Sequence, residues 1–320
     1  MSLAWRTSDR HTSAHMIYVS GSEGHPSEPC LCREHSMKLR PMTVLHFRRM
    51  WDRVEIKIAL CVILVLIALS FVELCLHFYG FERDALPSAA YGWIGNMDVM
   101  QIISIHIWFY LLFFILSASV YADSIEADRK RQTAILLATR TSMADYVRSS
   151  ACVTFIGGFA VVFVPLLLSQ LLSLLIFPLN SPELGFQALM NEGAHLDNIR
   201  VNIISRNVLF PNLYFNHPYV LNLIYMLYAS LIGGLVSVIT LGISLFRSFR
   251  RPILIGLPMI IVFTVSFILP RELQMQFYFF PEATLEGLSY GYFFGLPVIL
   301  ALVAAFLLWY PIRARRDILL

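Results

Sequence analysis

The ionisable and amide side chains inside apolar stretches are the first candidates for chemistry in this chain of 320 residues. Glu73 and His77 are one helical turn apart and would share a helix face, while His106 and Gln170 lie in two other apolar stretches. Such groups are costly in lipid, so Glu73, His106 and Gln170 could line a substrate or proton pathway. The simpler interpretation, which we favour, is that Glu73 pairs with His77 and that His106 hydrogen-bonds a neighbouring helix.

Sequence motifs of common catalytic sites are absent from the chain. It contains no GxxxxGK[ST] phosphate loop, no HExxH zinc helix and no GxSxG elbow. Its five cysteines match no strong zinc spacing. We therefore expect this chain to have no catalytic residue and to bind no metal or cofactor, and any ATP that drives its work must be hydrolysed by another polypeptide.

The segment 121–148 is the densest group of charges between two apolar stretches, and it reads YADSIEADRKRQTAILLATRTSMADYVR. Acidic, basic and apolar residues alternate over a short link, which favours a helix that docks on a partner over a solvated loop. The candidate contact residues are Glu126, Asp128, Arg129, Arg131, Leu136 and Leu137. Thr141 or Ser142 can cap a second short helix that contains Asp145.

The elements that position these residues are long apolar helices. The chain is 58% hydrophobic and 14% charged, whereas soluble domains are about 45–50% apolar and about 25% charged. A helix needs about 20 apolar residues to cross a bilayer. Six stretches approach or exceed this length: 58–79, 99–121, 151–177, 220–246, 253–269 and 292–310. The sequence therefore predicts an all-α integral membrane protein with six transmembrane helices.

The distribution of basic residues predicts the orientation of these helices. With both termini cytoplasmic, all but four of the 24 Lys and Arg residues lie on the cytoplasmic side. The four exceptions are Arg83, Arg200, Arg206 and Arg271. This asymmetry is the positive-inside pattern, and we expect the protein in the cytoplasmic membrane of a bacterium.

The remaining segments divide into tails and loops. Residues 1–36 lack an apolar period, and we expect them to be disordered; a natural start at Met37 is a hypothesis. Residues 37–57 form an amphipathic helix that we expect to lie as an elbow in the membrane interface. On its wheel the apolar face holds Val44, Phe47, Met50, Trp51 and Val54, and the polar face Arg48, Arg49, Asp52 and Arg53.

Small residues mark places where two of the helices can approach each other closely. Gly157-Gly158 and Gly233-Gly234 lie in the third and fourth predicted spans. The predicted spans 58–310 enclose a cytoplasmic loop at 122–150 and a long outer loop at 178–219, and a basic cytoplasmic tail follows at 311–320.

The charged segment resembles the first cytoplasmic loop of type-2 ABC exporter permeases, which reads approximately E-R-E-x-G-T-L-E-x-L-L-A-T-P-x-S. Asp128-Arg129 stand at the family's Glu-Arg. Thr133, the run 136–139 (Leu-Leu-Ala-Thr) and Ser142 match the Thr, L-L-A-T and Ser of the pattern.

The resemblance has departures and a limited extent. Gln132 replaces the family's Gly, Arg140 replaces its Pro, and the stretch 133–138 is one residue short. The layout of an elbow and six spans resembles the family over 38–320, although the specific motif covers only about twenty residues, and the long loop 178–219 is atypical.

The resemblance implies a transport subunit without its own ATPase site. Two such subunits, identical or related, would pair in the bilayer, and each would dock a separate ATP-binding cassette subunit that holds ATP and Mg²⁺. Glu126, Asp128, Arg129 and Arg131 would be polar contacts to that ATPase, with Leu136 and Leu137 as the apolar anchor. Export of a substrate follows from the family alone, and no nucleic-acid partner is expected.

Two other functions remain open from the residues. A membrane-embedded enzyme could use Glu73, His77 and His106. An ATPase-independent binding or immunity protein could share the six-span layout.

Overall fold

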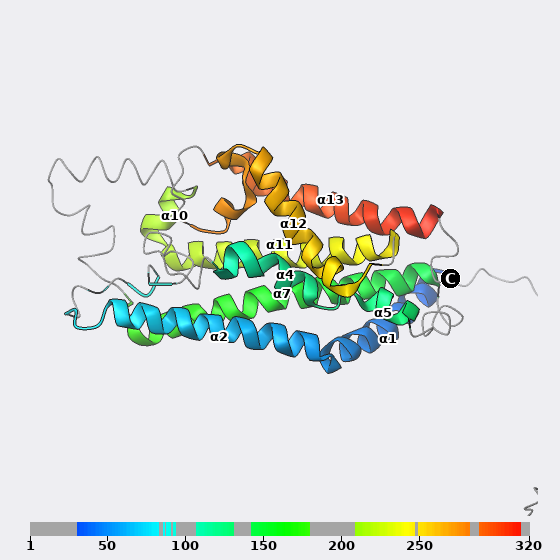
Figure 1. Cartoon of the computed structure of the whole chain (residues 1–320), viewed down its shortest axis with the longest axis horizontal. Helices are drawn as coiled ribbons and strands as arrows, with labels where there is room; N and C mark the ends of the chain where they lie inside the picture. Colours follow the sequence, from blue (N-terminus) through cyan, green and yellow to red (C-terminus); the bar gives the residue numbers. More distant parts are fainter. Residues whose placement is uncertain are drawn as a thin grey trace, which may run out of the picture.

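The computed structural model describes residues 31–82, 86, 88–90, 92–93, 107–130, 142–179, 209–246, 249–281 and 288–314. Within these ranges the regular elements are all helices, and no strand occurs (Figure 1). The helices run side by side in an elongated bundle (Figure 1). The expectation of an all-α fold is therefore confirmed for the described part of the chain.

Five described helices are long and apolar enough to cross a membrane. They are α2 (Val54–His77), α7 (Met143–Ile176), α11 (Pro218–Phe246), α12 (Arg251–Ile268) and α13 (Tyr290–Ala314). These helices cover the predicted first, third, fourth, fifth and sixth spans. The chain is thus a membrane-embedded protein, because a soluble fold would not expose this much apolar helix surface.

The second predicted span, 99–121, is described only from residue 107 onward. Its described part starts with a π-helix, η3 (Ile107–Leu112), and continues as α4 (Phe113–Ser119). α4 packs against α7, α11 and α12, and Phe113 and Phe114 are fully buried. Residues 99–106 lie outside the described part, so a sixth span stays a prediction.

The helix α1 (Leu31–Asp52) is separated from α2 by a single residue, Arg53. The ψ angle of 139° at Arg53 takes the backbone out of the helical region, and the two helices meet at an angle (Figure 1). A separate helix before the first span was expected, and its place in the membrane interface stays a prediction. α1 begins at Leu31, inside the segment 1–36 that we expected to be disordered, and the disorder of that segment stays a prediction.

The residues of the apolar face predicted for α1 differ in burial. Val44, Phe47 and Trp51 are exposed as expected, but Met50 is buried against the bundle. Met50 lies over Gly157 of α7, where an added Cβ would come within 2.7 Å of its sulfur atom. The missing Cβ of that glycine leaves room for the longer side chain.

The core of the bundle is the crossing of α7 and α11, with α2 and α13 on opposite sides (Figure 1). α7 is 34 residues long, or about 51 Å at 1.5 Å per residue, and it exceeds the roughly 30 Å hydrocarbon core. It begins at Met143, inside the predicted cytoplasmic loop 122–150. The short helix α5 (Ser124–Lys130) lies beside this first part of α7 (Figure 1).

Candidate functional site

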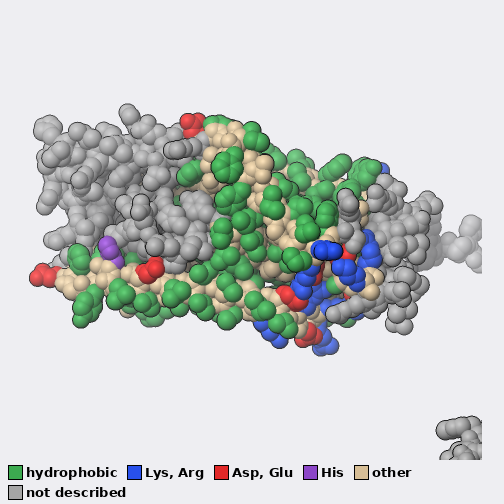
Figure 2. Space-filling view, in the orientation of Figure 1, with side chains coloured by type: hydrophobic (Ala, Val, Ile, Leu, Met, Phe, Trp, Pro, Cys, Tyr) green, Lys and Arg blue, Asp and Glu red, His purple; other side chains and the backbone are tan. Residues whose placement is uncertain are grey.

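Lys and Arg side chains gather at one end of the bundle, around α1 and α5 (Figure 2). We call this end, which holds Arg49, Arg53, Lys130 and Arg251, the basic end. It contains a network of ion pairs between elements that are far apart in the sequence. The network is the main polar feature among the described residues, and it forms the candidate site.

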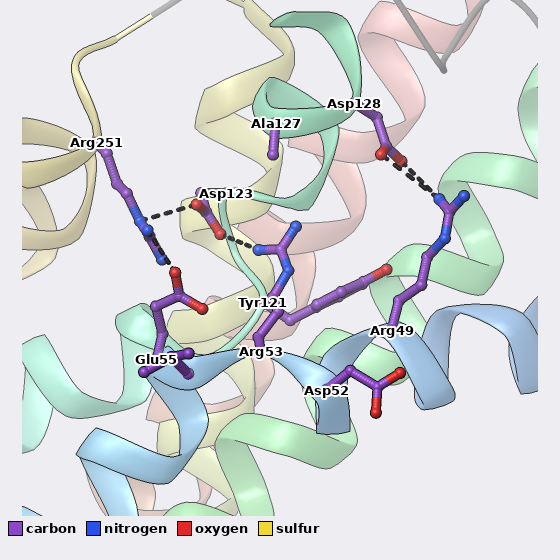
Figure 3. Close-up of a pocket in the computed structure, with 10 residues that line it drawn as sticks. Arg49, Asp52, Arg53, Glu55, Tyr121, Asp123, Ala127, Asp128 and Arg251 are labelled. Carbon is purple, nitrogen blue, oxygen red and sulfur yellow. Dashed lines mark hydrogen bonds and ion pairs between the residues drawn. The ribbon is translucent and has the colours of Figure 1, made fainter. Parts of the chain in front are cut away.

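Asp123 lies at the centre of the first branch of this network (Figure 3). Its Oδ1 accepts a hydrogen bond of 2.5 Å from Nη1 of Arg53. Its Oδ2 lies 2.9 Å from Nε of Arg251, and Nη1 of Arg251 donates to Oε1 of Glu55 over 2.6 Å. These contacts join the α1–α2 break, the start of α5 and the first residue of α12. Asp123 is buried, so charge pairing is what makes its burial tolerable.

Asp128 forms a second branch on α5 (Figure 3). Its Oδ2 accepts a hydrogen bond of 2.6 Å from the hydroxyl of Tyr146 on α7 and lies 3.4 Å from Nη1 of Arg49 on α1. The hydroxyls of Ser124 and Ser150 lie 2.9 Å apart and tie the start of α5 to α7. Through these contacts α5 is attached to two helices at once.

Tyr121 joins the two branches. Its φ of 61° is left-handed, and among the described residues no other side-chain-bearing residue has a positive φ. This conformation turns the chain between α4 and α5. The Tyr121 hydroxyl shares a 2.7 Å hydrogen bond with Nδ1 of His46, and the Arg53 guanidinium lies 4.7 Å from the centre of its ring.

His46 on α1 is fully buried in this network. Burial lowers the pKa of His46 from 6.5 to about 4; the positive charges of Arg49 and Arg53 add to this effect and the charge of Asp128 opposes it. His46 is therefore neutral at neutral pH. Its Nε2 atom has no hydrogen-bond partner among the described residues.

The predicted contact residues of the charged segment lie partly within this network. Glu126 and Asp128 are buried, and Glu126 pairs with Arg129 at 3.2 Å and with Lys130 at 3.3 Å. Lys130 is the exposed member of this group, with 60% of its side chain accessible. Arg131, Leu136 and Leu137 lie outside the described residues. That these six residues contact an ATPase stays a prediction.

The predicted cap at the end of the charged segment is confirmed at Ser142. Its hydroxyl accepts a hydrogen bond from the backbone N–H of Asp145. The helix that it begins is not a separate short one, as the sequence suggested, but the start of α7. The boundary was missed because residues 143–150 are too polar to read as part of a span.

Of the residues proposed for a substrate pathway, the structure describes Glu73 and Gln170. Gln170 is buried, donates to the carbonyl oxygen of Ala89 over 3.0 Å and accepts from the amide of Asn222 over 2.8 Å. Glu73 and His77 are exposed on α2, and His106 lies outside the described residues. Gln170 therefore satisfies a backbone carbonyl of the segment 88–90. Asn222, which the sequence analysis missed, shares this role through Ala90.

The site in the described part of the chain is a set of ion pairs that connect helices. Over the described ranges, no three His, Cys, Asp or Glu side chains come close enough to hold a metal ion. Sequence reasoning missed Arg49, Arg53, Asp123 and Arg251, which form most of the network. One signal was present: Arg49 and Arg53 are one helical turn apart, next to the end of a helix.

Comparisons of the chain with models of protein families, with curated proteins and with solved structures found no match.

Proposed function

We propose that this chain is the membrane subunit of an ATP-driven ABC exporter, which moves a substrate outward while a separate subunit hydrolyses ATP. Support comes from the motif resemblance at 128–142 and from the apolar helices. The observation that carries most weight is the attachment of α5. It is the element from which the segment 131–141 departs, and it is bonded to several helices of the bundle.

The ion pairs and hydrogen bonds of α5 are suited to transmit a displacement of this helix to the rest of the bundle. Asp128 links α5 to α1 and α7, and Asp123, just before α5, links it to the α1–α2 break and to α12. Charge-assisted hydrogen bonds are short, directional and about twice as strong as neutral ones. A displacement of α5 would therefore move α1, α7 and α12 together rather than deform a loose loop.

The residues of the charged segment differ in burial, and this indicates different roles for them. Glu126 and Asp128 hold α5 within the protein by intrachain pairs, whereas the exposed Lys130 and the following Arg131, Leu136 and Leu137 are the better candidates for touching an ATPase. In this proposal two copies of the chain, or two related chains, pair around the pathway.

Affinity purification of the tagged chain from its own membranes tests the proposal. We expect a soluble ATPase with a phosphate loop to co-purify in about equal amount. Replacing the apolar anchor, Leu136→Asp with Leu137→Asp, should reduce this co-purification at least about tenfold, because a charge in an apolar contact costs several kcal/mol.

The matched control changes two exposed apolar residues near the other end of the bundle. Tyr79 and Leu179 are 86% and 63% exposed and follow α2 and α7. Tyr79→Asp with Leu179→Asp adds the same charges and should leave the ATPase bound. Absence of any ATPase from the wild-type complex, or equal loss in both double variants, would contradict the proposal.

A further inference from the structure

The ion-pair network surrounds a cavity of about 450 Å³ at the basic end (Figure 3). This volume falls within the range of small-molecule sites, about 300–1,000 Å³. The guanidinium groups of Arg49, Arg53 and Arg251 all line it. Three guanidinium groups around one cavity are suited to phosphate oxygens, because each carries five N–H donors in a planar fork.

Two nitrogens of Arg251, Nε and Nη2, form no hydrogen bond within the described part of the chain. Nη1 of Arg251 bonds to Glu55 and Nε faces Asp123, but Nη2 is buried and has no hydrogen-bond partner among the described residues. A buried donor without a partner costs free energy, and a ligand oxygen could satisfy it only after the Arg251 side chain shifts toward the cavity. This atom is an observation independent of the cavity shape.

The carboxylates that line the cavity outnumber its arginines by one. Four carboxylates line it, and three of them, Glu55, Asp123 and Asp128, pair with the arginines. The fourth, Asp52, forms no ion pair within the described part of the chain and points away from the guanidinium groups (Figure 3). A ligand that complements the site therefore carries a cation as well as a phosphate.

An apolar stripe begins at the same cavity. Val54 lines the cavity and is 63% exposed. Exposed residues continue this stripe along one face of α2 at intervals of three or four positions. They are Val54, Ile58, Cys61, Val65, Leu69, Val72 and Leu76. From Val54 to Leu76 the stripe is about 33 Å long, close to the roughly 30 Å hydrocarbon core. Its first half matches the acyl chains of one leaflet.

We propose that this cavity binds the head group of a zwitterionic phospholipid with a primary ammonium group, whose acyl chains lie on the stripe of α2. The phosphate accepts hydrogen bonds from the guanidinium groups of Arg49, Arg53 and Arg251 that line the cavity, and the ammonium donates to Asp52. A free phosphate or a soluble phosphoamine would use the cavity but not the stripe, which favours a lipid. The inference requires only a membrane-embedded chain and is independent of any ATPase.

Native mass spectrometry of the purified, delipidated chain in detergent tests this site. Dioleoyl phosphatidylethanolamine, phosphatidylcholine and phosphatidylglycerol are titrated separately. We expect phosphatidylethanolamine to bind about tenfold more tightly than the other two, because phosphatidylcholine offers no ammonium N–H and phosphatidylglycerol no cation. Arg251→Lys should weaken its binding about tenfold, since lysine keeps the charge but loses the fork. Arg250→Lys, at an exposed neighbour outside the cavity, is the matched control.

Asp52→Asn tests the ammonium half of the head group apart from the phosphate half, and it changes an exposed residue. It should abolish the preference for phosphatidylethanolamine while leaving phosphate-dependent binding. Equal affinities for the three lipids in the wild type, or equal effects of Arg251→Lys and Arg250→Lys, would overturn the proposal. Displacement of the lipid by equal concentrations of glycerophosphoethanolamine or inorganic phosphate would assign the cavity to a free anion and overturn the lipid as its ligand.

Discussion

His46 has one ring nitrogen bonded to Tyr121 and the other without a partner among the described residues, in a position that no solvent reaches. Arg49 and Arg53 approach from its own helix and the break that follows, and Asp128 approaches from α5. Two positive charges and burial outweigh one negative charge. The packing therefore holds the imidazole in its neutral form.

This has a consequence for stability. Because the pKa of His46 is about 4 in the fold and 6.5 in the unfolded chain, the unfolded state binds more protons between these values, and stability falls as the pH falls from 6.5 to 4. The full loss from this residue is about 3 kcal/mol. The apparent melting temperature in detergent should decrease over this range and decrease less in His46→Asn.

His77→Asn is the control for the pH experiment. His77 is exposed on α2, so this substitution should leave the pH profile like that of the wild type. Parallel profiles for wild type and His46→Asn would mean that His46 does not titrate differently in the folded and unfolded states.

At the scale of elements, the crossing of α7 and α11 depends on positions without a side chain. A Cβ at Gly158 would collide with the hydroxyl of Ser237 and lie 3.0 Å from the carbonyl oxygen of Gly233. Ser237 itself donates to the backbone oxygen of Ser117 on α4. The close approach predicted from the paired glycines is thus confirmed, and it brings three helices together.

Gly158→Ala should destabilise the protein by about 1–3 kcal/mol, because the backbone of α11 cannot move aside as a flexible side chain could. Gly256→Ala on α12 is the matched substitution, since a Cβ there meets nothing within 4 Å. It should be neutral or slightly stabilising. Thermal unfolding of the two variants in the same detergent measures the difference, and equal melting temperatures would contradict the crossing as described.

The helices could be predicted from the sequence because the length of an apolar run determines whether a helix can span a bilayer. The network could not, since its members are far apart: Arg251 is 196 residues from Glu55, and Arg53 is 70 residues from Asp123. No local spacing encodes such pairs. The charged segment could be singled out as important, but whether its acids face inward or outward depends on how α5 packs.

At the scale of the whole molecule, the two ends of the bundle differ in charge. The ion pairs of Arg49, Arg53 and Arg251 lie at one end, with α5. α2 extends from this end over 24 residues, about 36 Å, to the region of Tyr79. From the positive-inside rule we expect the basic end to lie in the cytoplasm.

Labelling of single cysteines in intact cells tests this orientation. In a variant without the five native cysteines, Lys130→Cys and Tyr79→Cys place a thiol at sites that are exposed at opposite ends. A membrane-impermeant maleimide should label Tyr79→Cys in intact cells and Lys130→Cys only after lysis. Labelling of both after lysis is the control for accessibility. If Lys130→Cys reacts in intact cells, α5 faces outward, where no cytoplasmic ATPase can reach it, and the proposed transport function fails with the orientation.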